Sequence, residues 1–302
     1  MNDKLLASPK EIKFFSVLGG ILIILIISVF VLGTAEKPKK VVEKIYINPF
    51  EHLNLVADSA IVFDVRMNKI LFSKNAEERL PLASLTKLMT ALVAVSNASE
   101  NNVVVISPQA IKSEGDSGLR VGERWVLRKL VDFLLTTSSN DGASALALSF
   151  GTEKNFVNLM NIKADEIGMK NTYYFNETGI DENLEKGGAY GTARDTSTLF
   201  AYILKNYPNL LSATAQPKFV VSSLDNILHT AKNTDLITEN IPGIKGSKTG
   251  FTDLAGGNLV VAFDPEIGRP IVVVVLASTA KDRFVDVEKL VEASIKSIEN
   301  PL

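Results

Sequence analysis

Three short motifs place serine, lysine and asparagine side chains in a fixed order along the chain. Ser84 and Lys87 form an S-x-x-K motif, Ser138 and Asn140 form an S-x-N motif, and Lys248 begins a K-T-G motif. A serine hydroxyl is a poor nucleophile until a neighbouring base accepts its proton. A lysine can be that base if burial or nearby positive charge lowers its pKa. The motifs therefore indicate nucleophilic catalysis by a serine with a lysine as its base.

The position of each motif distinguishes it from chance repeats. The S-x-x-K pattern occurs again at Ser278, and S-x-N patterns also begin at Ser73 and Ser99. Each motif alone is weak, because short patterns recur by chance. Only Ser84 stands at the start of an apolar helix pattern and precedes the other two motifs, and only Ser138 lies between that helix and the K-T-G. We therefore take the set that begins with Ser84 as the candidate site.

The helix that begins at Ser84 is predicted to bring Lys87 to the serine. Residues three apart on a helix share a face, so Lys87 is expected within reach of the Ser84 oxygen. The apolar flanks of the lysine supply burial, and Lys248 is a candidate for a second nearby positive charge. A nucleophile at a helix start also gains the positive end of the helix dipole and backbone N–H groups for an oxyanion hole. Apolar residues at i, i+3 and i+4 spacing predict the buried face: Leu85, Leu88, Met89, Leu92 and Val93.

The elements that position these motifs follow from hydrophobic periodicity. Apolar runs predict strands at 60–65, 69–73, 244–251, 258–263 and 271–277. Helices are predicted near 126–135, 141–150, 153–167 and 283–298. The S-x-N motif then falls in the turn between two helices, and the K-T-G falls on a strand. Strands at both ends with helices between them indicate one α/β domain, with a sheet built from the two termini and covered by a helical region.

The N-terminal segment is predicted to be a transmembrane anchor over residues 14–33. None of the nineteen residues from Phe14 to Leu32 is charged, and a helix of that length spans about 28 Å, close to the hydrocarbon thickness of a bilayer. We expect residues 1–13 to be cytoplasmic, 34–45 to form a lysine-rich linker, and 46–302 to form the catalytic domain. A cleaved signal peptide is the alternative, because the small residues Gly33, Thr34 and Ala35 suit a signal peptidase.

The composition argues against several classes of site. The chain has no cysteine, which removes disulfides, thiolate catalysis and cysteine-ligated metals. Its two histidines, His52 and His229, are far apart in sequence, and a zinc hydrolase usually needs two or three histidine ligands. A formal net charge of −2 gives no basic surface for nucleic acid. We therefore expect no metal, no cofactor and no nucleic-acid partner, and a Ser-His-Asp triad through His229 stays open as an alternative.

The motifs and the residues around them resemble the D-alanyl-D-alanine carboxypeptidase family, serine peptidases of the low-molecular-weight penicillin-binding type. The resemblance covers roughly residues 50–298, and it is carried by 80–92, 134–147, 171–172, 193–195 and 246–256, together with Asn176 and Gly179. It implies a serine β-lactamase/D,D-peptidase-like α/β fold. In that fold, strands from both termini form an antiparallel sheet beside a helical region, here preceded by one transmembrane helix.

The family pattern implies a role for each residue of the first two motifs. Ser84 would attack the carbonyl of the penultimate D-Ala and form an acyl-enzyme, releasing the terminal D-Ala, with Lys87 as the general base. Ser138 would relay protons to the leaving amine, and Asn140 would hold the substrate amide. The backbone N–H of Ser84 would form the oxyanion hole together with that of Phe251.

The K-T-G strand is implied to bind the end of the substrate. Lys248 and Thr249 would bind the C-terminal carboxylate of the peptide, or the corresponding carboxylate of a penicillin. Gly250 would leave room for the substrate to lie along the strand as an added β-strand.

The resemblance implies a function, and alternatives to it remain open. The implied activity is that of a serine-type D-Ala-D-Ala carboxypeptidase, which removes the terminal D-alanine from peptidoglycan stem peptides and binds β-lactams as covalent inhibitors. We expect a single-pass protein of the cell membrane with its catalytic domain on the extracytoplasmic side, or a secreted protein if the N-terminal segment is cleaved. The alternatives are a D,D-endopeptidase that cuts peptidoglycan cross-links, a class A-like β-lactamase, and a non-catalytic cell-wall binding protein.

Two further residues bear on these alternatives. Class A β-lactamases need a glutamate to activate the deacylating water, and Glu177 lies in a stretch that faintly resembles theirs. Asn176 and Gly179 fit the peptidase pattern better, so we interpret Glu177 as a surface loop residue. A Ser-His-Asp hydrolase of the α/β type needs a G-x-S-x-G serine turn, which the sequence lacks. We therefore interpret His229 as a loop or hydrogen-bonding residue.

Overall fold

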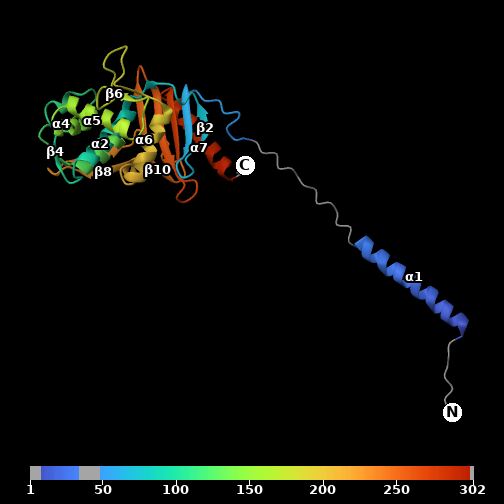
Figure 1. Cartoon of the computed structure of the whole chain (residues 1–302). Coiled ribbons are helices and arrows are strands. Elements are labelled where there is room, and N and C mark those ends of the chain that lie inside the picture. The colour runs from blue at the N-terminus through green and yellow to red at the C-terminus, as the bar shows by residue number, and fades with distance from the viewer. Residues whose placement is uncertain (1–7, 34–47, 300–302) are drawn as a thin grey trace. The chain divides into compact units, whose positions relative to one another are not determined.

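The computed structural model describes residues 8–33 and 48–299 of the chain (Figure 1). The chain divides into two compact units, Met1–Tyr46 and Ile47–Leu302. The predicted linker at 34–45 lies outside the described residues, as do residues 1–7 of the segment that is predicted to be cytoplasmic. The predicted domain boundaries therefore stay predictions.

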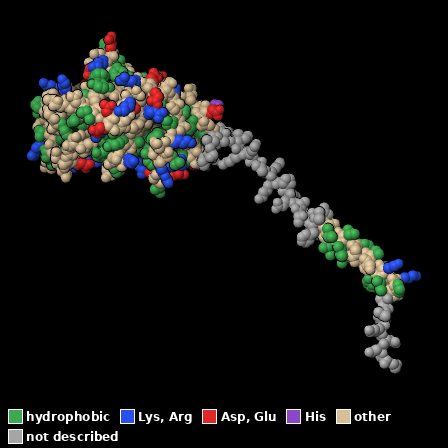
Figure 2. Space-filling model, in the orientation of Figure 1, with side chains coloured by type: hydrophobic (Ala, Val, Ile, Leu, Met, Phe, Trp, Pro, Cys, Tyr) green, Lys and Arg blue, Asp and Glu red, His purple; other side chains and the backbone are tan. Residues whose placement is uncertain are grey.

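The first unit contains one long apolar helix, α1 (Pro9–Gly33). It begins earlier than the predicted position 14, because Ser8 and Glu11 cap its N-terminus. The Ser8 backbone N–H donates to the Glu11 carboxylate at 2.8 Å, and the Glu11 N–H donates to Ser8 Oγ at 3.4 Å. Figure 2 shows apolar side chains along this helix and basic side chains at one of its ends. Among the described residues, α1 is the one helix long and apolar enough to cross a membrane.

The second unit is built around a five-stranded antiparallel sheet. Its strands are β1 (Ser59–Asp64), β2 (Lys69–Lys74), β10 (Ile244–Thr252), β11 (Gly256–Phe263) and β12 (Ile271–Ser278). They lie in the order β10-β11-β12-β1-β2, so the first strand of the unit pairs with its last one. The register runs from Ser59 opposite Leu276 to Asp64 opposite Ile271. The predicted sheet from the two termini of the domain is confirmed, and each strand lies within two residues of its predicted bounds.

The central strands are apolar at consecutive positions because the sheet is covered on both faces. In β12, Val272 and Val274 belong to the larger core, which the sheet shares with the helical region. Val273 and Val275 point to the opposite face and belong to a second core. Helix α7 (Asp282–Glu299) covers that second face through its buried apolar residues. A strand with helices on both faces has no solvent-facing side, so it carries no polar alternation.

The helical region contains α2 (Thr86–Asn97), α3 (Leu127–Thr137), α4 (Asn140–Ser149), α5 (Glu153–Glu166) and α6 (Ala193–Asn206). Figure 1 shows α2, α4 and α5 gathered at one end of the unit, with α6 nearer to the sheet. The sequence prediction missed α6, whose first turn is polar. Thr192 caps this helix, because its hydroxyl accepts the N–H of Asp195 at 3.0 Å.

Short elements connect the helices and the sheet. They are β3 (Leu80–Pro81), β4 (Val103–Val105), β5 (Arg124–Val126), β6 (Tyr173–Tyr174), β7 (Ala189–Gly191), β8 (Lys218–Ser222), β9 (Leu228–Lys232), and the 3-10 turns η1 (Ala83–Leu85), η2 (Ala110–Lys112) and η3 (Ser212–Ala215). The strands form a three-stranded sheet β3-β7-β6 and the pairs β4-β5 and β8-β9. None of these was predicted, because strands of two to five residues are too short to show a period.

Candidate active site

Ser84 lies in the 3-10 turn η1, directly before helix α2. The turn depends on Ala83, whose φ of +47° is in the left-handed region that residues other than glycine rarely adopt. The backbone around Gly179 packs against it so closely that a Cβ at Gly179 would lie 1.9 Å from the Ala83 carbonyl oxygen. A strained turn of this kind persists only where its surroundings hold it, so the Gly179 segment is part of what fixes the serine.

Lys87 is one helical turn beyond Ser84, and the predicted reach between them is confirmed. Its Nζ lies 2.9 Å from Ser84 Oγ, 2.6 Å from Asn140 Oδ1 and 2.7 Å from the carbonyl oxygen of Thr178. The ammonium form has three N–H groups, and these three oxygens match them. When the amine is neutral, it has one lone pair, and the hydroxyl of Ser84 is the neighbour that can donate to it.

Burial sets the charge state of Lys87. The side chain is fully buried, and this burial lowers its pKa from 10.5 to about 7, while the charge of Glu177 acts in the opposite direction. Burial was the predicted cause. The pKa of Lys248 lies well below its usual range because of burial and the positive charges of Lys87 and Arg283, with Asp235 acting against them. The predicted lowering of the Lys87 pKa by Lys248 is not among its causes, and it is the charge of Lys87 that lowers the pKa of Lys248.

The S-x-N motif forms the junction between α3 and α4, as predicted. Ser138 ends α3 in the left-handed conformation, with φ +62°, and the side chain of Ser139 caps α4. Asn140 is the first residue of α4, and its Nδ2 donates to the carbonyl of Glu114 at 2.5 Å. Lys248 Nζ donates to Ser138 Oγ at 2.9 Å, so the second and third motifs meet directly.

The K-T-G motif lies on β10, at the edge of the five-stranded sheet. Lys248 is 1% exposed, and its Nζ also donates to the carbonyl of Thr249 at 2.9 Å. Thr249 is held by a hydrogen bond of 2.6 Å between its hydroxyl and that of Thr234. The prediction of a strand at the K-T-G is confirmed, and the structure adds Thr234 as a partner that the sequence gave no reason to select.

Gly250 packs against the turn that holds the serine. A Cβ at Gly250 would lie 2.9 Å from the carbonyl oxygen of Leu82 and 3.2 Å from the backbone nitrogen of Ser84. A glycine is therefore needed for the close approach of β10 to η1. The sequence interpretation assigned this glycine to room for the substrate, and the structure gives a reason for it within the protein itself.

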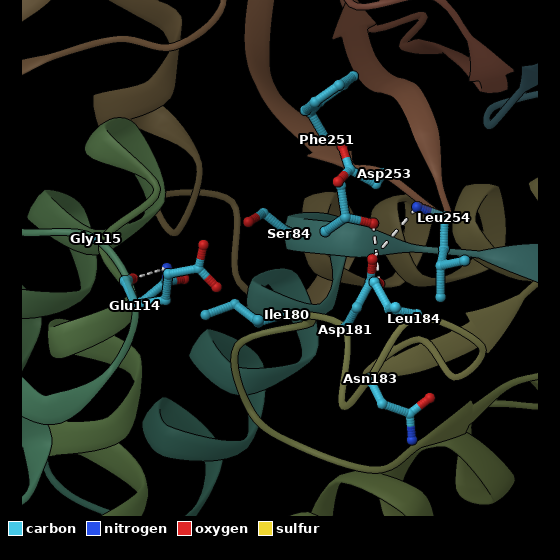
Figure 3. Close-up of a pocket in the computed structure, with 12 residues that line it drawn as sticks. Ser84, Glu114, Gly115, Ile180, Asp181, Asn183, Leu184, Phe251, Asp253 and Leu254 are labelled. Carbon is cyan, nitrogen blue, oxygen red and sulfur yellow. Dashed lines mark hydrogen bonds between the residues drawn. The ribbon is translucent and has the colours of Figure 1, made fainter.

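Ser84 opens onto a cleft of about 620 Å³. Figure 3 shows the serine between Glu114 and Gly115 on one side and Phe251 and Asp253 on the other. The side chain of Phe251 is half exposed at this rim.

Ser138 lines an adjoining pocket of about 310 Å³, and Asn140 lines both this pocket and the cleft. Lys87 and Lys248 lie buried beneath the two openings. The structure therefore brings together all seven side chains or glycines selected from the three motifs, with the serines at the surface and the lysines below. Among the described residues, no group of three or more His, Asp or Glu side chains is placed to hold a metal ion.

The interpretation of Glu177 as a surface loop residue is wrong. Its side chain is 5% exposed, and its carboxylate accepts the hydroxyl of Ser144 at 2.5 Å. Its backbone carbonyl accepts the hydroxyl of Thr90 at 2.6 Å. The error arose because burial of a charged residue depends on partners distant in sequence, which local pattern does not reveal.

His229 lies on strand β9. Of the two interpretations from the sequence, a loop residue or a hydrogen-bonding residue, the second is confirmed. The Nε2 of His229 is 2.7 Å from the carboxylate of Glu123, and its ring packs against Trp125 and Phe133. Ser84 is not among its partners, which argues against a Ser-His-Asp triad. The second S-x-x-K pattern is also separate, because the hydroxyl of Ser278 donates to a carboxylate of α7.

A model of the D-alanyl-D-alanine carboxypeptidase family matches residues 47–280, which is most of the second unit. The chain belongs to this family. A D-alanyl-D-alanine endopeptidase of Pseudomonas aeruginosa is 35% identical over 246 residues, which cover 78% of this chain and 76% of the relative. The D-alanyl-D-alanine carboxypeptidase DacF of Bacillus subtilis is 31% identical over 251 residues and 80% of this chain. The matched part is 63% of the length of that relative, somewhat less than two thirds.

The solved structures of the family have the same fold. A penicillin-binding protein from Listeria monocytogenes, solved in its ampicillin-bound form, matches with a TM-score of 0.67 and 30% identity, over 80% of this chain and 98% of that one. The predicted α/β fold of the D,D-peptidase type is therefore confirmed, and so is the family resemblance.

Proposed function

We propose that the chain is a serine D,D-peptidase that removes the terminal D-alanine from peptidoglycan stem peptides through an acyl-enzyme on Ser84. The observation that carries the proposal is the approach of the buried Lys87 amine to the Ser84 hydroxyl, at 2.9 Å, with a pKa of about 7 for that amine. A lysine with this pKa is neutral in a large part of the molecules at neutral pH, so it can accept a proton. The names of the family and of its relatives support the substrate class.

In the acylation step, Ser84 Oγ attacks the carbonyl carbon of the penultimate D-Ala while its proton passes to Lys87 Nζ. The carbonyl oxygen takes the negative charge of the tetrahedral intermediate. We propose that the backbone N–H groups of Ser84 and Phe251 stabilise this oxyanion, and losing one such donor typically costs about 3 kcal/mol of transition-state stabilisation. The close packing of Gly250, which precedes Phe251, on the Ser84 backbone supports this assignment.

The leaving amine of the terminal D-Ala needs a proton when the C–N bond breaks. Ser138 Oγ accepts a hydrogen bond from Lys248 at 2.9 Å, so the hydroxyl can donate its own proton to the amine and recover one from the lysine. Water then attacks the ester carbonyl on Ser84 and gives up one proton, which passes through Ser138 to Lys248 and replaces the proton that the leaving amine took. The ester bond breaks, and the acid product and free serine are released. Lys87, which holds the proton of the serine, is placed to return it.

The carboxylate of the substrate is proposed to bind at Lys248 and Thr249. Both are on the edge strand β10, where the Thr249 hydroxyl is fixed by Thr234. Asn140 is proposed to hold the substrate amide, since it lines the cleft beside Ser84. A penicillin carries a carboxylate next to a reactive amide, so the same groups would bind it, and the ampicillin-bound form of a relative supports this.

Covalent labelling by a fluorescent penicillin tests the proposed nucleophile. We expect the wild type to be labelled and Ser84→Ala to give no label, with the adduct located on the peptide that contains Ser84 by mass spectrometry. Ser278→Ala is the matched control, because it removes the serine of the second S-x-x-K pattern and is expected to label normally. Failure of the folded wild type to label would contradict the proposal.

A D,D-endopeptidase on the same site is the second candidate. It is favoured by one observation: the Pseudomonas aeruginosa endopeptidase has the higher identity of the two relatives and is matched over more of its own length. Digestion of purified muropeptides separates the two activities. Release of D-Ala from pentapeptide monomers supports the carboxypeptidase, whereas loss of cross-linked dimers without D-Ala release supports the endopeptidase.

We further propose that α1 anchors the protein in the cell membrane, with the catalytic unit on the extracytoplasmic side where peptidoglycan lies. The length and apolar surface of α1 support this. The mass of the protein extracted from native membranes tests it. A mass equal to that of the full chain, in a fraction that resists washing at high pH, is expected for an anchor, and a shorter soluble form would indicate cleavage.

A further inference from the structure

The buried carboxylate of Glu177 has no role in the proposed reaction, yet it lies next to the segment that touches Lys87. Thr178, its neighbour in sequence, gives its carbonyl oxygen to Lys87 Nζ at 2.7 Å. Burying a carboxylate is costly unless it is hydrogen-bonded or near a positive charge. Glu177 has both kinds of compensation, from Ser144 and from the charge of Lys87. A buried carboxylate next to the segment that contacts Lys87 therefore needs a structural or functional explanation.

Four separate segments contact one another around Lys87. Lys87 itself comes from α2, and Asn140 from α4 accepts from it at 2.6 Å. Thr178 accepts through its backbone, and Glu114 holds Asn140 through its own carbonyl at 2.5 Å. These contacts form an upper layer directly below Ser84.

The same four segments form a second layer beneath the first. Glu177 lies at its centre, and it accepts from Ser144 of α4 through its carboxylate at 2.5 Å and from Thr90 of α2 through its carbonyl at 2.6 Å. The hydroxyl of Ser113 lies 2.8 Å from that of Ser144. All of these hydroxyls are neutral, so the charge of the lower layer comes from Glu177.

The two layers are in register along the chain. Thr90 lies one helical turn beyond Lys87 on α2, and Ser144 lies one turn beyond Asn140 on α4. Ser113 and Glu114 are adjacent, and so are Glu177 and Thr178. Each segment therefore gives one group to the layer of Lys87 and one to the layer of Glu177, and a shift of the lower layer moves the upper one.

We propose that Glu177 is a positioning residue for the catalytic base. Its carboxylate binds Ser144 of α4 beneath Lys87, while its backbone carbonyl binds Thr90 of α2. Its negative charge stabilises the protonated lysine after the serine has given up its proton. This inference rests on the proposed function of Ser84 and Lys87. Glu177 touches neither the serine nor the substrate cleft, so it acts through Lys87 alone.

The electrostatics agree with this geometry. The charge of Glu177 raises the pKa of Lys87 against the larger effect of burial. Burial raises the pKa of Glu177, while the hydrogen bond from Ser144 and the charge of Lys87 lower it, and the charge of Glu153 on α5 raises it. Two further charged residues, Lys154 and Glu182, line a pocket of about 440 Å³ next to Glu177. The charge of Lys87 also acts on Lys248 of β10, whose pKa it lowers.

The pH profile of penicillin acylation by Glu177→Gln tests the proposal. The wild-type rate is expected to rise with pH and to reach half of its plateau near pH 7, as Lys87 loses its proton. The amide keeps the shape of the carboxylate and removes the charge, so the protonated lysine becomes less stable and the midpoint moves to lower pH by about one unit. Ser144→Ala is expected to move it in the same direction by less, because Glu177 then holds its charge more weakly.

Two controls separate this effect from general destabilisation. Glu123→Gln removes another buried carboxylate, which is paired with His229, and is expected to leave the midpoint of acylation unchanged. An NMR titration of isotope-labelled lysine in the full chain in detergent reports the pKa of Lys87 without any substrate. The signal of Lys87 is identified by its loss in Lys87→Met.

The outcomes distinguish failure of this inference from failure of the proposed function. A wild type that is not acylated contradicts the proposed function, and the NMR titration then decides on Glu177 by itself. Equal Lys87 midpoints in the wild type, Glu177→Gln and Ser144→Ala would overturn the inference. An unchanged acylation profile with a stalled acyl-enzyme in Glu177→Gln would also overturn it, because it would indicate a direct hydrolytic role.

Discussion

Replacing Lys87 with methionine should make the folded protein less active and change how its stability depends on pH. The substitution keeps an unbranched side chain of similar length and removes the amine. Loss of a general base typically lowers a rate by about 10²–10⁴-fold. Loss of the amine also leaves Asn140 Oδ1 and the Thr178 carbonyl without their donor, which destabilises the protein equally at every pH.

The pH-dependent part of the stability follows from the pKa of Lys87. In the unfolded chain this lysine keeps its proton up to about pH 10.5, whereas in the folded protein it loses the proton near pH 7. Between these values the unfolded state binds one more proton, so the wild type gains about 1.4 kcal/mol of unfolding free energy per pH unit. From pH 7 to pH 10 this amounts to about 4 kcal/mol, which the methionine variant lacks.

Urea unfolding of the full chain in detergent at pH 7 and pH 10 measures the difference. Trp125 is the single tryptophan and is fully buried, so its fluorescence reports unfolding of the catalytic unit. We expect Lys87→Met to be more stable relative to the wild type at pH 7 than at pH 10. Lys281→Met, which removes an exposed lysine of the second S-x-x-K pattern, should show no such change. An equal difference at both pH values would refute the assignment of a buried, readily deprotonated Lys87.

Three other substitutions probe separate parts of the site. Gly250→Ala places a methyl group 3.2 Å from the Ser84 nitrogen. It should lower the rate of penicillin acylation by at least tenfold, which corresponds to about 1.4 kcal/mol of activation free energy. An unchanged rate would contradict the close packing. Ser138→Ala should reduce D-Ala release about 10²-fold, measured by steady-state kinetics, and full activity would remove its relay role. His229→Ala leaves Glu123 buried without its partner and should lower the unfolding free energy by about 2–4 kcal/mol. The folded variant should still be acylated by penicillin, and loss of acylation would indicate a catalytic role for the histidine.

The three motifs could be predicted to form one site because each carries a local constraint. The i, i+3 spacing of Ser84 and Lys87 on an apolar helix fixes their distance with little help from the rest of the fold. The S-x-N turn is set by the apolar periodicity of the helices on either side of it. The order of the motifs and the strand pattern around Lys248 then leave few arrangements in which the three motifs form one site.

Other parts of the site depend on contacts between segments that are distant in sequence. Glu177 looks like a surface residue until Ser144 and Lys87 are placed beside it. The role of Gly250 in close packing depends on the path of β10 past Leu82. The short strands were missed because their local patterns are weak, and their positions come from the surfaces on which they pack. Helix α6 was missed although it has a capping threonine and the apolar residues Leu199, Phe200 and Ile203 at helical spacing.

The order of strands in the main sheet has a consequence for how the protein is made. Strand β1 pairs with β12 on one side and β2 on the other, and the K-T-G strand joins only through β11 and β12. A growing chain that has already produced Ser84 and Lys87 therefore has neither the Lys248 edge nor the strand that closes the sheet. Such an unfinished chain holds no working nucleophile and no finished core. Activity therefore starts only after the last strands of the sheet have been made and paired.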